Sequence, residues 1–503
     1  MSTAESAAPR AGRREWIGLG VIALPCLLYS MDLTVLNLAV PRLSAALRPS
    51  SAQLLWIVDI YGFVLAGCLI PMGTLGDRIG RRKLLLMGAA AFGVASIFAA
   101  FATSAAVLIV ARAVLGVAGA TLAPSTLSLI RNMFLDANER TSAIGVWVTS
   151  YSVGGAIGPL VGGVLLDHFW WGSVFLVGVP VMVLLLVVGP VLLPEFRDPK
   201  AGRIDLPSTV MSLGAVLFVI YGVKRIAVMN TYQWPLIFIG IGLGLGVLFV
   251  RRQRTLKDPM IELALFRNPA FSAALLSYTI ATFAAFGIFL LVGQYLQLVT
   301  GLSPLAAGVA TLPLFFGFIA GALVSPVVAR RVRPARLMIG GLVFSAIGFG
   351  LLTRVDAPSP LLMIVAGITI YALGLSPVFT LATDFMVGAA SPERAGAASA
   401  LSETGSELGG ALGVGILGSI GTAVYRSAML RDVPAGLSST VVDAARNTLG
   451  GALAVASRLP ASSGSALSAV ARNAFAQSLA VTAWACVAVV MATAFALGIA
   501  SRR

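Results

Sequence analysis

Four acidic residues lie inside long apolar runs of the chain: Asp32, Asp59, Glu403 and Glu407. The first stands in the stretch LLYSMDLTVLNLAVP, residues 27–41. A carboxylate near the centre of a bilayer costs roughly 2.5–3.5 kcal/mol. Low dielectric disfavours the charged form, so such an acid can exchange a proton at physiological pH or attract a cation. One carboxylate that holds either a proton or a cation is the simplest device for exchanging the two.

Other residues in the apolar runs suit the same chemistry. Glu403 and Glu407 are four residues apart and share a helix face. Arg112 is the deep basic residue, and the sequence leaves open a structural tie to a neighbouring acid or a role in proton transfer. Tyr151 and Tyr295 are the aromatic residues whose ring faces we expect to meet a cation, although most aromatic residues pack or face lipid. Asp384, near the end of a run, is expected at the membrane interface.

The composition is that of a membrane protein. The chain has 503 residues, of which 58% are hydrophobic and 11% charged, whereas a soluble domain is about 25% charged. Its mean hydropathy is +0.95, and runs of about 20 apolar residues, enough to cross the hydrocarbon core, recur throughout. We therefore expect an all-α polytopic protein with fourteen spans. They cover residues 16–41, 52–75, 84–104, 106–130, 141–165, 172–194, 207–226, 234–252, 271–296, 304–328, 335–353, 359–388, 396–425 and 473–499.

The distribution of basic residues predicts the orientation. With the N-terminus inside, 24 of the 35 lysine and arginine residues fall in inside segments. Positive charge is enriched in cytoplasmic loops, so we expect both termini in the cytoplasm. The net charge of +15 therefore reports topology and does not predict binding to nucleic acid. The long outside loop, residues 426–472, is weakly amphipathic and suits a surface-lying or hairpin element.

Glycine spacing predicts an internal repeat. Glycines occur every fourth residue at 154, 158 and 162, and again at 405, 409 and 413. An offset of about 255 residues then relates spans 1–6 to spans 9–14 and sets Glu407 opposite Ser152. We expect an N-terminal half at residues 1–205, two inserted helices at 206–255 and a C-terminal half at 256–503. Because small residues allow close helix approach, we expect the halves to rock against each other through these two glycine faces.

Several other classes of protein find no support. The three cysteines are widely separated in apolar runs, which predicts neither a disulfide framework nor a metal site. The pattern G-x-x-x-x-G-K-[ST] is absent, so ATP is not the expected energy source. No set of catalytic residues is evident, and we expect neither enzymatic activity nor a cofactor.

The loop after the second span reads GTLGDRIGRRK, residues 73–83. Its glycines permit a tight turn between packed helices. An acid among basic residues at a helix junction can form a breakable latch between two conformations, although charge alone would also fit a plain cytoplasmic loop. The residues of this predicted latch are Gly73, Asp77, Arg78, Gly80, Arg81 and Arg82.

These motifs resemble the major facilitator superfamily, whose signature loop reads G-x-L-x-D-R-x-G-R-R-K. LIVARAVLGVAGA, residues 108–120, is similar to its R-x-x-x-G helix, and residues 27–41 resemble the D-x-T-x-x-N-x-A-x-P motif of its fourteen-span drug–proton antiporters. QYLQLVTGLSPLAAG, residues 294–308, and ETGSELGGALG, residues 403–413, also resemble that subfamily. GGAIGPLVGGVLL, residues 154–166, is similar to the antiporter motif; its matching residues are Gly154, Gly158, Pro159, Gly162 and Gly163.

The resemblance implies the 6+2+6 fold and a proton-coupled exporter of amphipathic cations such as quaternary ammonium compounds, dyes and fluoroquinolones. It implies proton coupling by Asp32, Arg112 and Glu403. Substrate binding is expected at Asp59, Glu403, Glu407, Tyr151 and Tyr295. The expected partners are protons, cationic drugs and membrane lipid, and the expected state is a monomer in a bacterial cytoplasmic membrane. A proton-coupled metabolite symporter or exporter on the same fold is the alternative.

Two departures from the family pattern stand out. The second-half copy of the signature loop, ARRVRPAR at 329–336, keeps its basic residues and lacks the acid and the glycines. A latch is therefore expected only in the first half. Some relatives carry an acid in the tenth span, where this sequence has none between Pro304 and Val328, so the preference for substrate charge does not carry over in full.

Overall fold

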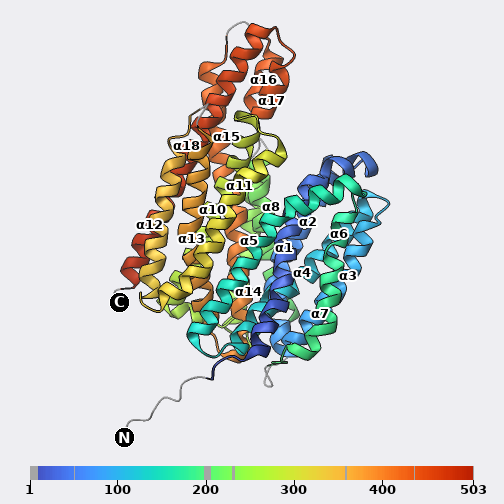
Figure 1. Ribbon diagram of the computed structural model, residues 1–503, viewed down its shortest axis with the longest axis vertical. Coiled ribbons are helices and arrows are strands. Elements are labelled where there is room, and N and C mark those ends of the chain that lie inside the picture. Colours follow the sequence, from blue (N-terminus) through green and yellow to red (C-terminus); the bar gives the residue numbers. More distant parts are fainter. Residues whose placement is uncertain are drawn as a thin grey trace.

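The computed structural model describes residues 9–49, 51–197, 205–228, 233–356, 360–434 and 437–501. Within these ranges the chain is helical and contains no β-strand. Fourteen of the helical segments are long and apolar enough to cross a membrane, which confirms the predicted class and number of spans. They stand side by side in one bundle, and α1 begins at the same end of the bundle at which α18 finishes (Figure 1).

The first helices share one hydrophobic core, built from buried residues between Leu19 and Leu193 with Val387 added from a later helix. Polar residues begin two of these helices: Ser104 caps α4, and Asp136 accepts hydrogen bonds from two backbone N–H groups at the start of α5. The helices are α1 (Arg13–Leu47), α2 (Ser51–Ile79), α3 (Arg81–Ala100), α4 (Ala105–Met133), α5 (Ala137–His168), α6 (Ser173–Leu176) and α7 (Gly178–Leu192).

The last helices surround a second core, whose buried residues run from Phe271 to Leu497. Proline occupies the first turn of three of them, where its missing N–H and fixed φ are tolerated. The long helices are α10 (Pro269–Gln294), α11 (Pro304–Ala329), α12 (Pro334–Leu352), α13 (Leu361–Ala389), α14 (Ala395–Leu412), α15 (Gly418–Asp432) and α18 (Ala461–Ala500). The short 3-10 helices are η1 (Leu263–Arg267) and η3 (Pro392–Arg394), and the short π-helices are η2 (Tyr295–Val299) and η4 (Gly413–Leu417).

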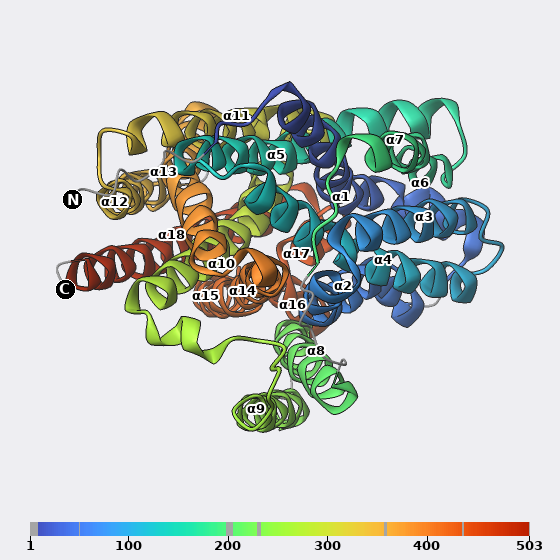
Figure 2. The ribbon, with the colours of Figure 1, turned by 90° about the horizontal axis from the view of Figure 1, so that it is seen from below.

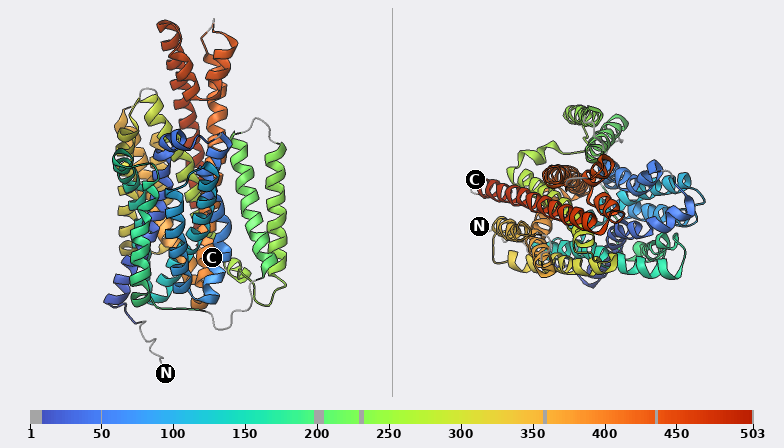
Figure 3. Two further views of the ribbon diagram at one scale, coloured as in Figure 1. Left: turned by 90° about the vertical axis from the view of Figure 1, so that its right-hand side faces the viewer. Right: turned by 90° about the horizontal axis from the view of Figure 1, so that it is seen from above.

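Helices α8 (Leu206–Val228) and α9 (Gln233–Gln253) form a separate pair at the side of the bundle (Figures 2 and 3). Helix α8 packs on α2 and also touches α14, whereas α9 packs mainly on α8. Arg252 at the end of α9 bonds Asp205 just before α8, with atoms 2.6 and 2.8 Å apart. Hydrogen bonds from Arg252 and Ser208 hold the pKa of the Asp205 carboxyl below its usual range. This ion pair thus joins the end of α9 to the start of α8.

Among the described residues, the main helix pairs that bring the two cores together are α5 with α11, α2 with α14, α4 with α14, and α5 with α13, and α4 also touches α13. We call this boundary the seam. Seen from below, most of the early helices lie on one side and α10–α13 with α18 on the other, with α5 beside α11 (Figure 2). The residues on the two sides of the seam are hundreds of positions apart in sequence. Any group that joins the two cores therefore lies at the boundary between them.

The loop predicted at 426–472 is largely helical. Helix α15 continues to Asp432, and α18 begins at Ala461, twelve residues before the predicted span. Two short helices, α16 (Ser439–Asn447) and α17 (Leu449–Ala456), connect them. Together they form a hairpin that stands beyond the other helices (Figure 3). Tyr425 and the Ala445 carbonyl, 2.9 Å apart, join α15 to α16, so the hairpin has its own internal packing.

Candidate transport site

Asp32 of α1 pairs with Arg112 of α4. Nη1 of Arg112 lies 3.5 Å from Oδ2 of Asp32. The arginine side chain is 1% exposed and the aspartate side chain 16%, so the acid is the more accessible partner. Burying a pair is costly when its geometry is loose, and protonation of Asp32 would remove its attraction to Arg112. The pair is suited to gain and lose a proton. The side chains of Thr34, Asn37 and Pro41, in the same motif, lie outside the described part of the structure.

Two aromatic rings cover Arg112. The carbon of its guanidinium group lies 5.3 Å from the centre of the Tyr61 ring and 6.0 Å from that of Phe175. Such contacts stabilise a desolvated cation, so Arg112 keeps a partner when Asp32 is neutral. Tyr61 is fully buried and lies within electrostatic range of both Asp32 and Glu407. Its ring contacts both Arg112 and Tyr29, the residue that bonds Glu407 of α14.

A hydrogen bond crosses the seam midway along the helices. The hydroxyl of Tyr29 in α1 donates to Oε1 of Glu407 in α14. Tyr29 precedes Asp32 by three residues, which places both on one face of α1. Its ring centre lies 6.2 Å from that of Tyr61 and 5.5 Å from that of Tyr151. The predicted acid of the second half is thereby brought to the same region as the predicted acid of the first.

Glu403 lies one turn before Glu407 and is 7% exposed. Its Oε1 has no hydrogen-bond partner among the described residues. The carboxylate is within electrostatic range of Tyr151 in α5 and Tyr278 in α10. A buried carboxylate without a partner is costly, so a proton or a bound cation would complete this position. Glu403 and Glu407 lie one turn apart on α14, as their spacing in the sequence predicts.

The aromatic residue Tyr151 belongs to this group. Its ring packs edge-on against Trp147, with centres 4.7 Å apart, and the indole N–H of Trp147 donates to Thr126 at 3.1 Å. The hydroxyl of Tyr151 is buried beside the thiol of Cys26 in α1. We call this set the central cluster; its members are Tyr29, Asp32, Tyr61, Arg112, Tyr151, Glu403 and Glu407. The cluster contains acids that can hold a proton or a cation, and aromatic ring faces lie beside them. Exchange of a cation for a proton requires both features.

Two predicted binding residues lie elsewhere. Tyr295 was expected in the substrate site, but its hydroxyl donates to the Asp356 carbonyl at 2.6 Å, in the connection after α12. That prediction is wrong, because this tyrosine ties helix ends together. Asp59 is half-buried on the face of α2 that carries Trp56 and Phe63. Phe63 packs against Tyr221 of α8, so this face of α2 lies beside the inserted pair.

The glycine motif of α5 packs inside its own half. A Cβ added at Gly154 would lie 2.1 Å from the Leu27 carbonyl oxygen, and one at Gly162 would lie 3.0 Å from Val35, both in α1. Gly158 is buried, Gly163 has open space around it, and the side chain of Pro159 lies outside the described part. The motif therefore sets the contact between α1 and α5, and α1 carries Asp32.

The second glycine series repeats this arrangement. A Cβ at Gly409 would lie 2.3 Å from the Thr279 carbonyl oxygen, and one at Gly413 would lie 2.2 Å from the Phe283 carbonyl oxygen, both in α10. The two series thus make equivalent contacts, α5 on α1 and α14 on α10, as the repeat predicts. The expectation that the glycine faces meet across the halves is wrong. A small-residue face predicts close approach and does not identify the partner helix.

Alanine should have different effects at a glycine in close contact with a neighbouring helix and at a glycine with open space around it. We expect Gly154→Ala to force α1 away from α5, at a cost of about 1–3 kcal/mol or more for overpacking, and to lower transport strongly. Gly163→Ala, in the same helix, should be neutral or slightly stabilising, because alanine is favoured over glycine within helices. Thermal unfolding and dye efflux measure both effects. Equal behaviour of the two variants would contradict the proposed role of the α1–α5 contact.

The predicted latch is closed across the seam. Asp77 at the end of α2 accepts hydrogen bonds from the backbone N–H groups of Gly396 and Ala397, both at 2.9 Å, at the start of α14. Arg81 bonds Asp77 and also donates to the carbonyls of Pro392 and Glu393. A carboxylate is favoured at a helix N-terminus by the helix dipole and the free N–H groups. We call the end of the bundle that holds these residues the latch end.

The other predicted latch residues have distinct roles. Gly73 allows α2 to approach α14, since a Cβ there would lie 2.5 Å from the Gly396 oxygen. Gly80 has φ +111°, which favours glycine and makes the turn into α3. Arg82 bonds the Leu193 carbonyl at 3.0 Å and pairs with Glu195, so it stays within the first half. Only part of the motif therefore crosses the seam.

Arg78 reveals a partner that the sequence did not predict. It pairs with Asp258, in the segment after α9, at 3.1 Å. The other oxygen of Asp258 pairs with Arg394, just before α14, at 2.8 Å, and Glu262 adds a second acid to Arg394 at 3.2 Å. One carboxylate thus bridges arginines on both sides of the seam. Isolated acids in loops carry no spacing signal, which is why the sequence did not reveal this bridge.

A second acid closes the latch end between α5 and α13. Asp384 pairs with Arg140 at 2.7 Å and accepts a hydrogen bond from Thr141 at 2.6 Å. Both side chains of the pair are largely buried, with 13% and 15% exposed. This contact adds a second closure to the predicted first-half latch, and it does not come from the second-half signature loop. The second-half signature loop has lost its acid. Asp384 of α13 instead supplies a carboxylate that contacts Arg140 and Thr141 at the start of α5.

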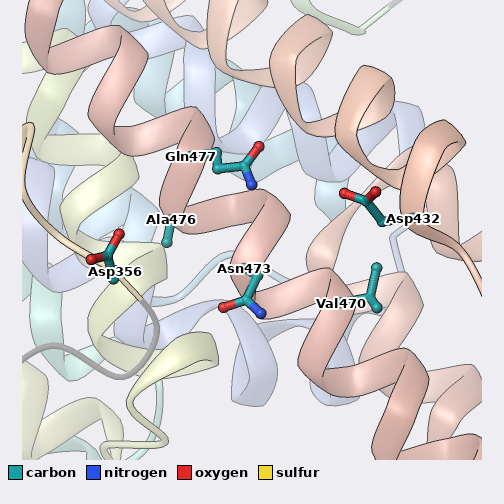
Figure 4. A pocket seen from close by; sticks show the side chains of 6 residues that line it. All are labelled: Asp356, Asp432, Val470, Asn473, Ala476 and Gln477. Carbon is teal, nitrogen blue, oxygen red and sulfur yellow. The ribbon is translucent and has the colours of Figure 1, made fainter.

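A separate cavity of about 280 Å³ lies beside the hairpin (Figure 4). Asp432 at the end of α15 and Asn473 and Gln477 of α18 line it, with Asp356 from the connection after α12. It is far along the helices from the latch end and separate from the central cluster. The sequence did not predict it, because its lining residues come from three separate segments.

Comparison with known proteins places this geometry in a family. The sequence matches the family model of the Major Facilitator Superfamily over residues 22–414. It is 45% identical to the multidrug efflux pump LfrA of Mycolicibacterium smegmatis, over 100% of both chains. It is 38% identical to the methyl viologen resistance protein SmvA of Salmonella typhimurium, over 92% of this chain and 93% of the relative.

Solved structures share the fold. The human organic anion transporter MFSD10 (TETRAN) is similar with a TM-score of 0.61 at 14% identity, over 95% of this chain and 99% of that chain. The proton:xylose symporter XylE matches with a TM-score of 0.55 at 14% identity, over 80% of this chain and 87% of that chain. Identities this low carry the fold alone, whereas the family model and the two sequence relatives extend over most of the chain. The chain belongs to the major facilitator superfamily.

Proposed function

We propose that the protein exports amphipathic cationic compounds in exchange for protons across a bacterial cytoplasmic membrane. The observation that carries this proposal is the central cluster, in which the Asp32–Arg112 pair and the two glutamates of α14 are brought together across the seam. The names of the relatives, a multidrug efflux pump and a methyl viologen resistance protein, support the same substrate class.

The proposed orientation puts the latch end in the cytoplasm, with both termini. The basic residues support it, since most of them fall in the segments that connect helices at this end. The proposed division is 1–205, 206–255 and 256–503, which agrees with two separate hydrophobic cores and a peripheral pair. In this orientation the closed latch blocks the cytoplasmic side, and opening it gives a drug access to the central cluster.

The proposed exchange follows from the charges. When Asp32 is protonated, Arg112 is held by the rings of Tyr61 and Phe175. When Asp32 is ionised, the pair re-forms. Interacting acids titrate as a group, so a cation bound at Glu403 or Glu407 favours release of a proton elsewhere in the cluster. Asp32 would thus serve the proton, and the glutamates would serve the drug and take part in coupling.

The division of roles predicts a difference between substrates. Glu403→Gln and Glu407→Gln each remove one negative charge, and a unit charge at 4 Å contributes about 1 kcal/mol in water and several times more in a less polar site. We expect about tenfold weaker efflux of a permanent cation, with a zwitterion less affected. Glu15→Gln, at a half-buried position in the first turn of α1, is the control, because glutamine keeps an acceptor for the Gly12 N–H. Equal loss of both substrates would rule out a substrate role distinct from coupling.

Inverted membrane vesicles test the function itself. A gradient that is acidic inside the vesicle should drive ethidium inward against its concentration, and collapse of the gradient should release it. Addition of ATP alone to vesicles without a gradient should have no effect. A proton-coupled importer, the alternative, would move its substrate out of inverted vesicles under the same gradient. Equal dye uptake with and without the pH gradient would exclude proton coupling.

A further inference from the structure

Tyr29 holds an unusual position among the residues of the central cluster. It lies in α1 of the first core, and its hydroxyl donates to Glu407 of α14 in the second. The ion pairs and hydrogen bonds of the latch lie at one end of the bundle, whereas the bond between Tyr29 and Glu407 lies midway along the helices. This hydroxyl therefore ties the halves together at an acid expected to attract the drug.

The surroundings hold Tyr29 in this place. Its ring meets Tyr151 edge-on, with centres 5.5 Å apart and planes at 71°, and it lies tilted against Tyr61 at 6.2 Å. These contacts fix the direction of the hydroxyl at little entropic cost, since tyrosine has only two side-chain torsions. The hydroxyl can release Glu407 while the ring remains against its neighbours.

An arriving cation competes with this hydroxyl. Oε1 of Glu407 already accepts a charge-assisted hydrogen bond, and such bonds are about twice as strong as neutral ones. A quaternary cation has no N–H to share with the carboxylate, so it must approach the same charge directly and gain contact with the ring faces around it. Binding would therefore displace the hydroxyl and break the tie across the seam.

We propose that Tyr29 is the residue that couples occupation of Glu407 to separation of the halves. In the empty protein its hydroxyl occupies Glu407 and holds α1 to α14. A bound cation replaces that hydroxyl, and the middle of the seam is then free to move. This inference rests on the proposed function, because it takes Glu407 as a site for the exported cation. It assigns Tyr29 a positioning and selectivity role that its type and place in the sequence did not reveal.

Equilibrium binding of tetraphenylphosphonium to the purified full-length protein tests the proposal. Tyr29→Phe keeps the ring and removes the competing hydroxyl, so its Kd should fall by about tenfold, the factor that corresponds to a hydrogen bond to a charged group. The maximal rate of transport should not rise, because the cation no longer triggers release of the tie. Tyr425→Phe, which loses a buried hydrogen bond to Ala445 in the hairpin, should keep the original Kd.

A double variant identifies the site of the effect. In the Glu407→Gln background the hydroxyl has no charged partner, so Tyr29→Phe should change the Kd by less than about twofold, a non-additive result expected for residues in contact. An unchanged or higher Kd in Tyr29→Phe alone, or the same fall in both backgrounds, would overturn the proposal and leave the transport function standing. Failure of the unmodified protein to bind the probe would overturn both.

Discussion

Asp32→Asn should abolish gradient-driven transport of every substrate. The amide has nearly the same shape as the acid, but it can neither release a proton nor neutralise Arg112, whose guanidinium lies 3.5 Å away. Dye accumulation in inverted vesicles should fall to the level of vesicles without the protein. Resistance of growing cells to a permanent cation and to a zwitterion should be lost alike, because the variant removes the coupling step itself.

The same variant has a measurable effect on stability. Loss of one charge eases insertion, but removal of one partner from a buried pair costs about 3–5 kcal/mol in other proteins. The loss here should be smaller, since the pair is long and the rings of Tyr61 and Phe175 remain against Arg112. The amount of protein in the membrane and its thermal unfolding must therefore accompany the transport measurement.

Asp167→Asn is the matched control for Asp32→Asn. Asp167 also pairs with an arginine, Arg42, at 3.3 Å, but both side chains are exposed. Exposed pairs contribute about 0–1 kcal/mol, so this variant should keep both stability and transport. If Asp32→Asn were folded, inserted and as active as Asp167→Asn, Asp32 would have no part in coupling.

Asp77→Asn should open the latch end. The carboxylate is 7% exposed and accepts three hydrogen bonds, two from the backbone of α14 and one from Arg81. Hydrogen bonds to charged groups contribute about 1.5–3 kcal/mol each, so the closed conformation should lose much of its population. Amide hydrogens of residues 392–400 should exchange faster, and gradient-driven efflux should drop strongly because the cycle can no longer close on this side.

Asp136→Asn separates the latch from simple helix capping. Asp136 also accepts hydrogen bonds from two backbone N–H groups at the start of a helix, but that helix, α5, directly follows it. Asparagine is a good capping residue, so this variant should keep amide exchange at 392–400 and transport near the original values. A matching loss in both variants would mean that Asp77 acts only as a cap.

Much of the fold could be predicted because the membrane imposes it. Apolar run length determined the number of spans, and glycine spacing predicted two related series that make equivalent contacts. The spacing could not show that Gly154 meets α1 and Gly409 meets α10, because small residues on a helix face do not identify the helix that packs against them. The helical hairpin beyond residue 425 was only partly anticipated, since its packing lies outside the apolar runs.

The acids of the site were predictable and their partners were not. Asp32, Glu403 and Glu407 stand out as charges in apolar runs, and the structure brings them together. The bond between Tyr29 and Glu407 joins residues 378 positions apart, and no local pattern encodes such a contact. Tyr295 was wrongly assigned to the substrate site for the same reason. The motif around it does not indicate that its hydroxyl bonds the distant Asp356 carbonyl.

The central claim is that one cluster exchanges a proton for a cation. Its most direct test is proton movement in liposomes that contain the purified protein and a pH-sensitive dye inside, with no gradient imposed at the start. A pulse of tetraphenylphosphonium outside should move protons in the opposite direction to the cation, with no such movement in Asp32→Asn liposomes. Protein-dependent cation entry without proton movement, or equal proton movement in both proteins, would contradict the account.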